Sequence, residues 1–185
     1  MMPIVSVVGK SNSGKTTLLE KLIPEMKNRG YRVGTIKHDV HNFEIDHEGK
    51  DTWRHTQAGA DTVAIASSSK LALFKKTDGE KPLDELAMAF FGDVDIILTE
   101  GFKRSDKPKI EVFRQELHPE PLCTRNDNLI AIVSDTEIDV GVPCYSSEEI
   151  RALADFLEKR FLSADTRQDR KKVPRKKMLR EPAVC

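Results

Sequence analysis

The sequence predicts an α/β fold: a layered, mostly parallel sheet with helices on both faces and a β-hairpin insertion. Short apolar runs alternate with helical patterns along the chain, which is typical of strands joined by crossover helices. Residues 129–133 form a nearly continuous apolar run, as expected for a strand that is covered on both faces. Two short apolar runs on either side of residues 67–69 indicate the hairpin.

The first crossover unit opens the chain. Residues 3–8 are predicted to form a buried strand, residues 17–28 a helix with one apolar face, and residues 31–36 a second strand parallel to the first. Pro24 lies inside the helical pattern. Because proline lacks an amide donor and crowds the preceding turn, we expect it to kink the helix or to end its first half.

The later elements follow the same alternation. A serine at 146 or 147 is expected to cap a final helix whose apolar positions run from Ile150 to Phe161. The elements predicted before it are a helix at 51–58, hairpin strands at 62–66 and 71–74, a helix at 82–91, and strands at 94–99, 109–114 and 129–133.

The length of 185 residues is enough for one domain with a substantial core, which we expect to span residues 1–162. The formal net charge is zero, but the charge is unevenly distributed. Residues 163–185 carry few apolar side chains and many basic ones, so we expect a basic, disordered C-terminal tail. Its cations are Arg167, Arg170, Lys171, Lys172, Arg175, Lys176, Lys177 and Arg180.

Cysteine usage and hydropathy indicate a cytoplasmic protein. The three cysteines form no C-x-x-C pair, so neither a disulfide framework nor a zinc site is predicted. The first apolar run is too short for a signal peptide. No run approaches the roughly 20 apolar residues of a membrane helix, so no membrane association is expected.

Residues 9–17 match the pattern G-x-x-x-x-G-K-[ST], directly after a predicted strand and directly before a predicted helix. Glycines let the backbone wrap around a phosphate, and the loop amides and helix N-terminus supply positive potential. In this pattern Lys15 reaches the β- and γ-phosphates and the Thr16 hydroxyl holds Mg²⁺. Lys10 is interpreted as an ordinary loop lysine. The predicted nucleotide-binding residues are Gly9, Ser11, Asn12, Ser13, Gly14, Lys15, Thr16 and Thr17.

Ligands bind at the carboxyl ends of the strands in an open parallel sheet. This rule tells which aspartates and glutamates can lie near a ligand. Asp95 and Glu100 lie near opposite ends of one predicted strand, roughly 16 Å apart. Only Glu100 is therefore expected near the phosphates and Mg²⁺. Asp46, in the polar loop after the second strand, is a further candidate, binding directly or through water. The predicted metal ligands are thus Thr16, Asp46 and Glu100.

Two further observations leave alternatives open. Asp135 follows the strand at 129–133 and could accept hydrogen bonds from guanine N1–H and its exocyclic amine, or could simply belong to a strand-end turn. Asp127 faintly matches a guanine-binding motif but precedes that strand, at the wrong end of the sheet. Four histidines between residues 38 and 55 match no common zinc spacing, so hydrogen-bonding or solvated histidines are favoured.

Several motifs together resemble one family, the molybdopterin-guanine dinucleotide biosynthesis protein B (MobB) family, which has a P-loop NTPase-like fold. The resemblance covers about residues 3–162 and is most specific where Gly49-Lys-Asp-Thr combines with Glu100-Gly-Phe-Lys. The other segments that carry it are residues 9–17, 36–38, 43–46, 57–60, 108–111 and 130–135. His47-Glu48 departs from the Lys-Pro of some members, and the tail lies outside the resemblance.

The resemblance implies a GTP-binding adaptor that is homodimeric and at best a weak GTPase. It would assist a partner guanylyltransferase that joins GMP from GTP to molybdenum–molybdopterin, in the service of molybdoenzymes. It also implies that residues 9–17, Asp46 and Glu100 form the GTP and Mg²⁺ site, with Asp135 on the side of the base.

There are three alternative functions, and the first two would use the same phosphate-binding loop. A small-molecule kinase would need a mobile, arginine-rich lid, and no such insertion stands out. A metallochaperone GTPase is suggested by the histidines but lacks cysteine ligands. Nucleic-acid binding through the basic tail is the weakest alternative.

Overall fold

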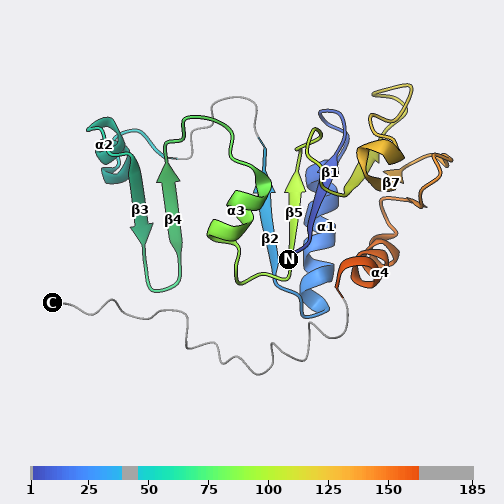
Figure 1. Cartoon of the computed structure of the whole chain (residues 1–185), viewed down its shortest axis with the longest axis horizontal. Coiled ribbons are helices and arrows are strands. Elements are labelled where there is room, and N and C mark those ends of the chain that lie inside the picture. The colour runs from blue at the N-terminus through green and yellow to red at the C-terminus, as the bar shows by residue number, and fades with distance from the viewer. Residues whose placement is uncertain (1, 39–45, 163–185) are drawn as a thin grey trace. The chain divides into compact units, whose positions relative to one another are not determined.

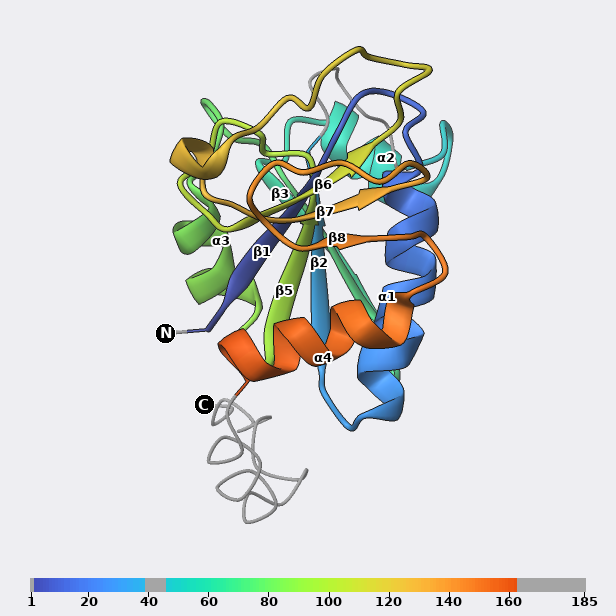
Figure 2. The same ribbon diagram turned by 90° about the vertical axis from the view of Figure 1, so that its right-hand side faces the viewer.

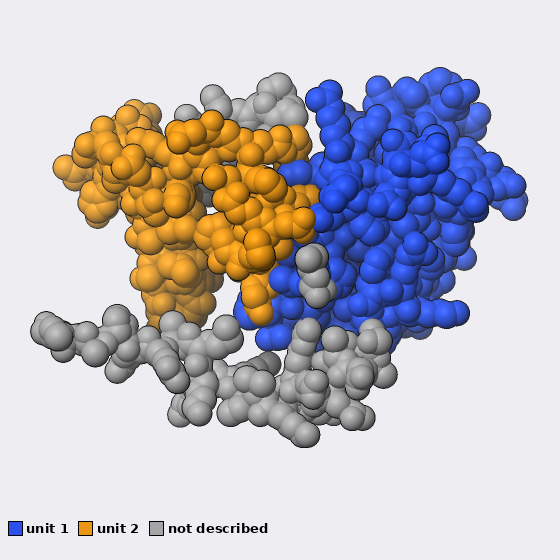
Figure 3. Space-filling view, viewed as in Figure 1, with its two compact units in different colours: residues 1–37, 93–185 blue, residues 38–92 orange. Residues whose placement is uncertain are grey.

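The computed structural model describes residues 2–38 and 46–162. The chain divides into two compact units, the first formed by Met1–Lys37 with Asp93–Cys185 and the second by His38–Gly92 (Figures 1 and 3). The predicted tail at 163–185 lies outside the described residues.

The first unit is built on a six-stranded sheet in the order β2-β5-β1-β6-β7-β8, and every strand pairing in it is parallel. The carboxyl ends of these strands therefore share one edge. The predicted parallel sheet is confirmed. The sequence does not predict strand β8, because two residues are too few to show a periodic pattern. The strands are β1 (Ile4–Val8), β2 (Val33–Lys37), β5 (Ile96–Glu100), β6 (Lys109–Phe113), β7 (Leu129–Ser134) and β8 (Cys144–Tyr145).

Helices α1 (Lys15–Asn28) and α4 (Ile150–Phe161) lie side by side and share one hydrophobic core with the sheet (Figures 1 and 2). Leu22, Met26 and Leu157 are fully buried in this core. Helix α1 runs on through Pro24, so the expectation that the proline ends its first half is wrong. Pro24 is exposed, and the buried apolar side chains on either side of it offset the missing backbone hydrogen bond.

The start of α4 also differs from the prediction. The residue that precedes the helix is Glu149, and no side chain caps the helix. Instead, the Glu149 carboxylate turns back and accepts a hydrogen bond from the Ser146 amide at 2.8 Å. The serines therefore belong to the turn between β8 and α4, and the turn is closed by glutamate.

Charged side chains are buried in β6, on the strand positions that alternate with the helix-facing Ile110 and Val112. The Lys109 ammonium donates to three carbonyls, those of Ser105, Lys107 and Asp127. The Glu111 carboxylate accepts from the Leu122 and Cys123 amides, while burial raises its pKa. These bonds satisfy the buried charges and hold the connection between β6 and β7 in place.

The second unit contains α2 (Asp51–Gln57), the antiparallel strands β3 (Thr62–Ala66) and β4 (Leu71–Lys75), and α3 (Leu83–Phe90). The predicted hairpin is confirmed. Its two strands form a separate sheet of their own. Over residues 2–38 and 46–162, no helix has the length and apolar character needed to cross a bilayer.

Candidate functional site

The loop at residues 9–17 joins β1 to α1 and wraps tightly because three of its residues have left-handed backbone conformations. Gly9, Asn12 and Gly14 have φ values of 146°, 63° and 97°. At Gly9 there is also no room for a side chain, since an added Cβ would lie 2.4 Å from the Val112 carbonyl oxygen and 2.7 Å from Ser13 Oγ. The neighbouring strand β6 therefore requires glycine at the start of the loop.

The Lys15 side chain folds back over this loop. Its Nζ donates to the carbonyls of Gly9 at 3.1 Å and Lys10 at 2.6 Å. Burial lowers the pKa of Lys15, the attraction of Glu100 opposes this shift, and Lys37 lowers the pKa further. The ammonium group is thus placed at the centre of the curved main chain, where an anion inside the loop would meet it.

Thr16 and Glu100 meet at the carboxyl edge of the sheet. Thr16 Oγ donates to both carboxylate oxygens of Glu100, at 3.0 and 3.1 Å, and Lys37 Nζ lies 3.7 Å from the same carboxylate. A hydroxyl and a carboxylate are hard oxygen ligands, so the pair suits Mg²⁺. Asp95 lies at the opposite edge, as expected, where it accepts a hydrogen bond from the Arg32 amide at 2.6 Å.

Asp46 belongs to the second unit. Its Oδ1 accepts from the His47 amide and the Thr52 hydroxyl, both at 3.0 Å. Its Oδ2 is buried and has no hydrogen-bond partner among the described residues, so this oxygen remains available to a ligand. Thr16 and Glu100 belong to the first unit.

The histidines between residues 38 and 55 form no multidentate metal site in the part of the chain that the structure describes. His38 Nε2 lies 3.2 Å from a carboxylate oxygen of Glu80, and His41 lies outside the described residues. Within 2–38 and 46–162, no three histidine, cysteine, aspartate or glutamate side chains are placed to hold one metal ion.

A cavity of about 220 Å³ lies beside the 9–17 loop. Arg114 lines the cavity and Asp135 does not. The Asp135 carboxylate lies 3.9 Å from Nε of Arg114. Sequence reasoning missed Arg114, although its position as the last residue of a predicted strand, at the carboxyl end, was a usable signal. The lining residues are Asn12, Ser13, Gly14, Thr17, Leu18, Lys21, Val112, Arg114, Val133 and Ser147.

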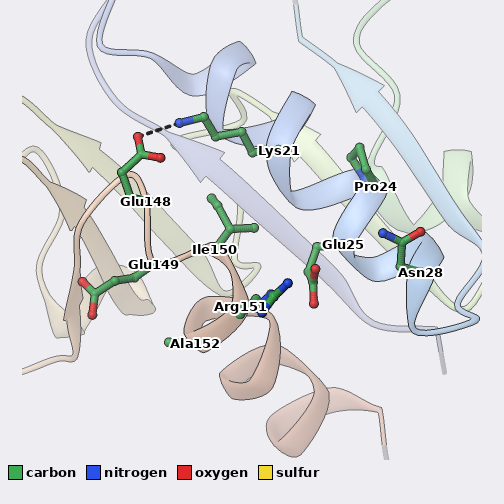
Figure 4. A pocket seen from close by; sticks show the side chains of 9 residues that line it. All are labelled: Lys21, Pro24, Glu25, Asn28, Glu148, Glu149, Ile150, Arg151 and Ala152. Atoms are coloured by element: carbon green, nitrogen blue, oxygen red, sulfur yellow. Dashed lines mark hydrogen bonds and ion pairs between the residues drawn. The ribbon is translucent and has the colours of Figure 1, made fainter.

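A larger groove of about 710 Å³ separates α1 from the start of α4 (Figure 4). Four of its charged side chains already have local partners. Lys21 contacts Glu148 at 2.8 Å, Glu25 contacts Arg29 at 2.8 Å, and Glu149 accepts from the Ser146 amide. Arg151, which also lines the groove, is exposed.

The parallel sheet, with a glycine-lysine-threonine loop between its β1 and α1, defines a P-loop NTPase-like fold. The sequence model described as "Molybdopterin guanine dinucleotide synthesis protein B" matches residues 4–135. The chain therefore belongs to the MobB family.

Proteins of this family from other organisms are similar in sequence or structure to most of the chain. The chain is 39% identical over 158 residues to the molybdopterin-guanine dinucleotide biosynthesis adapter protein of Haemophilus influenzae, covering 85% of this chain and 88% of that protein. The adapter protein of that name from Escherichia coli is 38% identical over 162 residues, covering 85% of this chain and 92% of the relative. The crystal structure of Bacillus subtilis MobB superposes with a TM-score of 0.70 at 29% identity, covering 86% of this chain and 98% of that one.

We predict that Gly9→Ala lowers the free energy of unfolding by about 2 kcal/mol or more, because the Cβ meets a strand carbonyl and the backbone is left-handed. Urea unfolding measures this. The matched control is Gly92→Ala, where an added Cβ meets nothing within 4 Å and we expect a change within about 0.5 kcal/mol. Equal losses in the two variants would contradict the steric role of Gly9.

Proposed function

We propose that this protein binds GTP with Mg²⁺ at the 9–17 loop and acts as an accessory protein in molybdopterin guanine dinucleotide biosynthesis. The observation that carries the proposal is the assembled loop, with the Lys15 ammonium held over its carbonyls and the Thr16–Glu100 pair beside it. The names of the relatives supply the biosynthetic role.

Each binding residue has a specific task in this proposal. Lys15 exchanges its two carbonyl acceptors for β- and γ-phosphate oxygens, while the amides of residues 9–17 surround the phosphates. Thr16, Glu100 and Asp46 would hold Mg²⁺, which neutralises phosphate charge when bound. The buried, unpartnered Oδ2 of Asp46 supports its inclusion. Asp135 is proposed on the side of the base.

The proposed role is that of an adaptor with at most weak GTP hydrolysis. Rapid hydrolysis requires a group that positions water and usually an arginine at the γ-phosphate. The Glu100 carboxylate is instead engaged by Thr16 and Lys37. The proposed partners are a guanylyltransferase, its molybdopterin substrate and the molybdoenzymes that receive the product. Free thiols at Cys123 and Cys144 are consistent with a cytoplasmic location.

We further propose that the protein is a homodimer through the hairpin of the second unit. A two-stranded sheet by itself is marginally stable. Leu71 and Leu73 lie on one face of it, together with their partners Ala66 and Ala64. The Leu71 and Leu73 side chains are 73% and 43% exposed, which is typical of a surface that is covered in an assembly.

Leu71→Lys should shift the protein from dimer to monomer, because it places a charge on this apolar surface. Sedimentation velocity at micromolar concentration measures the change. The control is Lys70→Leu, which alters the adjacent turn without adding charge and should leave the dimer intact. A Leu71→Lys protein that still sediments as a dimer, or a wild-type monomer, would contradict the proposed interface.

Lys15→Ala should weaken GTP–Mg²⁺ binding about 10- to 100-fold, as expected for the loss of a charged hydrogen-bond donor. Isothermal titration calorimetry measures the affinity. Lys10→Ala removes the same charge from the same loop but leaves the Lys10 carbonyl that Lys15 contacts, so its affinity should stay within about threefold of wild type. If both variants bind GTP as wild type does, the loop is not the phosphate site.

Glu100→Gln should weaken GTP binding in the presence of Mg²⁺ more than in EDTA, because the neutral amide removes negative charge from the metal site. The affinity ratio with and without metal, compared between wild type and variant, tests this expectation. The control is Asp95→Asn, which changes a carboxylate at the opposite edge of the sheet and should leave the ratio of affinities with and without Mg²⁺ unchanged. An equal loss for Glu100→Gln in both conditions would exclude the metal role.

A further inference from the structure

We propose that Arg114 and Asp135 act as a pair that reads the purine base of the bound nucleotide, and that the 220 Å³ cavity beside the loop receives the nucleoside half. The inference rests on the proposed GTP site and deepens it by naming the residues that select a 6-oxopurine over adenine.

The strand order separates a metal side from a nucleoside side. Strand β1, which leads into the 9–17 loop, pairs with β5 on one side and with β6 on the other. Glu100 ends β5. Arg114 and Asp135 directly follow β6 and β7, where Phe113 is in register with Ser134. They therefore stand next to each other at the ligand edge, on the side of the loop away from Glu100.

Arg114 lines the cavity together with residues of the loop, and Asp135 adjoins it through Arg114. Four of the cavity's lining residues, Asn12, Ser13, Gly14 and Thr17, belong to the loop. Arg114 Nη2 comes within 3.8 Å of the Cβ position at Gly14. Ser13 is 2% exposed, and its hydroxyl is buried without a hydrogen-bond partner among the described residues. A volume of 220 Å³ is below the roughly 300–1,000 Å³ of complete ligand pockets, so the cavity suits part of a nucleotide.

Lys21 also lines the cavity. Its ammonium contacts the Glu148 carboxylate at 2.8 Å (Figure 4) and the Ser147 carbonyl at 3.4 Å. Because Ser147 lines the cavity as well, these contacts fix the position of Ser147 relative to α1. Lys21 is thus a positioning residue for the nucleoside side.

The two charges of the pair keep their hydrogen-bonding capacity for a ligand. The 3.9 Å between Arg114 Nε and Asp135 Oδ2 is too long for a hydrogen bond. Arg114 Nη1 donates to its neighbour's carbonyl, that of Phe113, at 3.1 Å, which orients the guanidinium. The Arg114 and Asp135 side chains are 23% and 49% exposed, so a base can reach both.

The polarity of the pair matches guanine. Guanine presents the acceptor O6 next to the donor N1–H, whereas adenine presents an amine donor next to the acceptor N1. A guanidinium donates to O6 while the carboxylate beside it accepts from N1–H. With adenine, the guanidinium would face the amine donor and the carboxylate would face the acceptor N1. A site whose polar groups are left unpaired by the wrong base discriminates strongly against it.

Equilibrium titrations with GTP, ITP, ATP and tripolyphosphate, each with Mg²⁺, test the inference on the full chain. Wild type should bind GTP and ITP within about tenfold of each other, since both carry O6 and N1–H, and ATP about 10- to 100-fold more weakly than GTP. Arg114→Met should bring GTP affinity down to that for ATP and leave tripolyphosphate affinity unchanged. Asp135→Asn should also reduce the GTP-to-ATP ratio, because its amide can serve either base.

Arg151→Met, on the exposed part of α4, is the matched control and should keep the wild-type ratio. Circular dichroism establishes that the variants fold. If the Arg114→Met protein does not fold, the ratio of GTP to ATP affinity of Asp135→Asn decides the test. A wild-type preference for GTP that survives in the Arg114 and Asp135 variants, or ITP binding as weak as ATP binding, would overturn the inference while leaving the phosphate site standing. Failure of wild type to bind GTP or tripolyphosphate would instead overturn the proposed function, and the inference with it.

Discussion

The close approach of the 9–17 loop to strand β6 is the constraint on which the rest of the site depends. Gly9 passes so near the Val112 carbonyl that no side chain fits. This contact directs the main chain over the edge of the sheet, where the following residues curve and start α1 at Lys15. The Lys15 ammonium then fills the curve. A loop displaced from β6 would carry the lysine, the threonine and the helix N-terminus away with it.

The central position of β1 divides the site into two sides with different chemistry. On the β5 side, a hydroxyl and a carboxylate lie together near a second lysine, an arrangement suited to a metal and to phosphate charge. On the β6 and β7 side, Val112, Val133 and an arginine line the cavity, an arrangement suited to a base. Parallel pairing makes this separation possible, because all strands release their next residues at one edge.

The buried charges of β6 also help to position residues at the ligand edge of the sheet. Lys109 and Glu111 hold the connection between β6 and β7 through backbone carbonyls and amides. That connection fixes where β7 begins, and hence the level at which Asp135 emerges beside Arg114. Unpaired, either charge would be costly to bury, so the bonds specify a single path for the chain.

Local patterns in the sequence determined the strand–loop–helix unit, the hairpin and the edge on which Glu100 lies, because periodicity and a spaced glycine-lysine-threonine motif act over a few residues. They failed at Pro24, where burial of Leu22 and Met26 outweighs one lost hydrogen bond, and at the start of α4, where Glu149 closes the turn. Only the tertiary structure decided that Arg114 and Asp135 are neighbours and that Ser13 and Ser147 line one cavity. These residues are far apart along the chain, and strand order, which no local pattern encodes, brings them together.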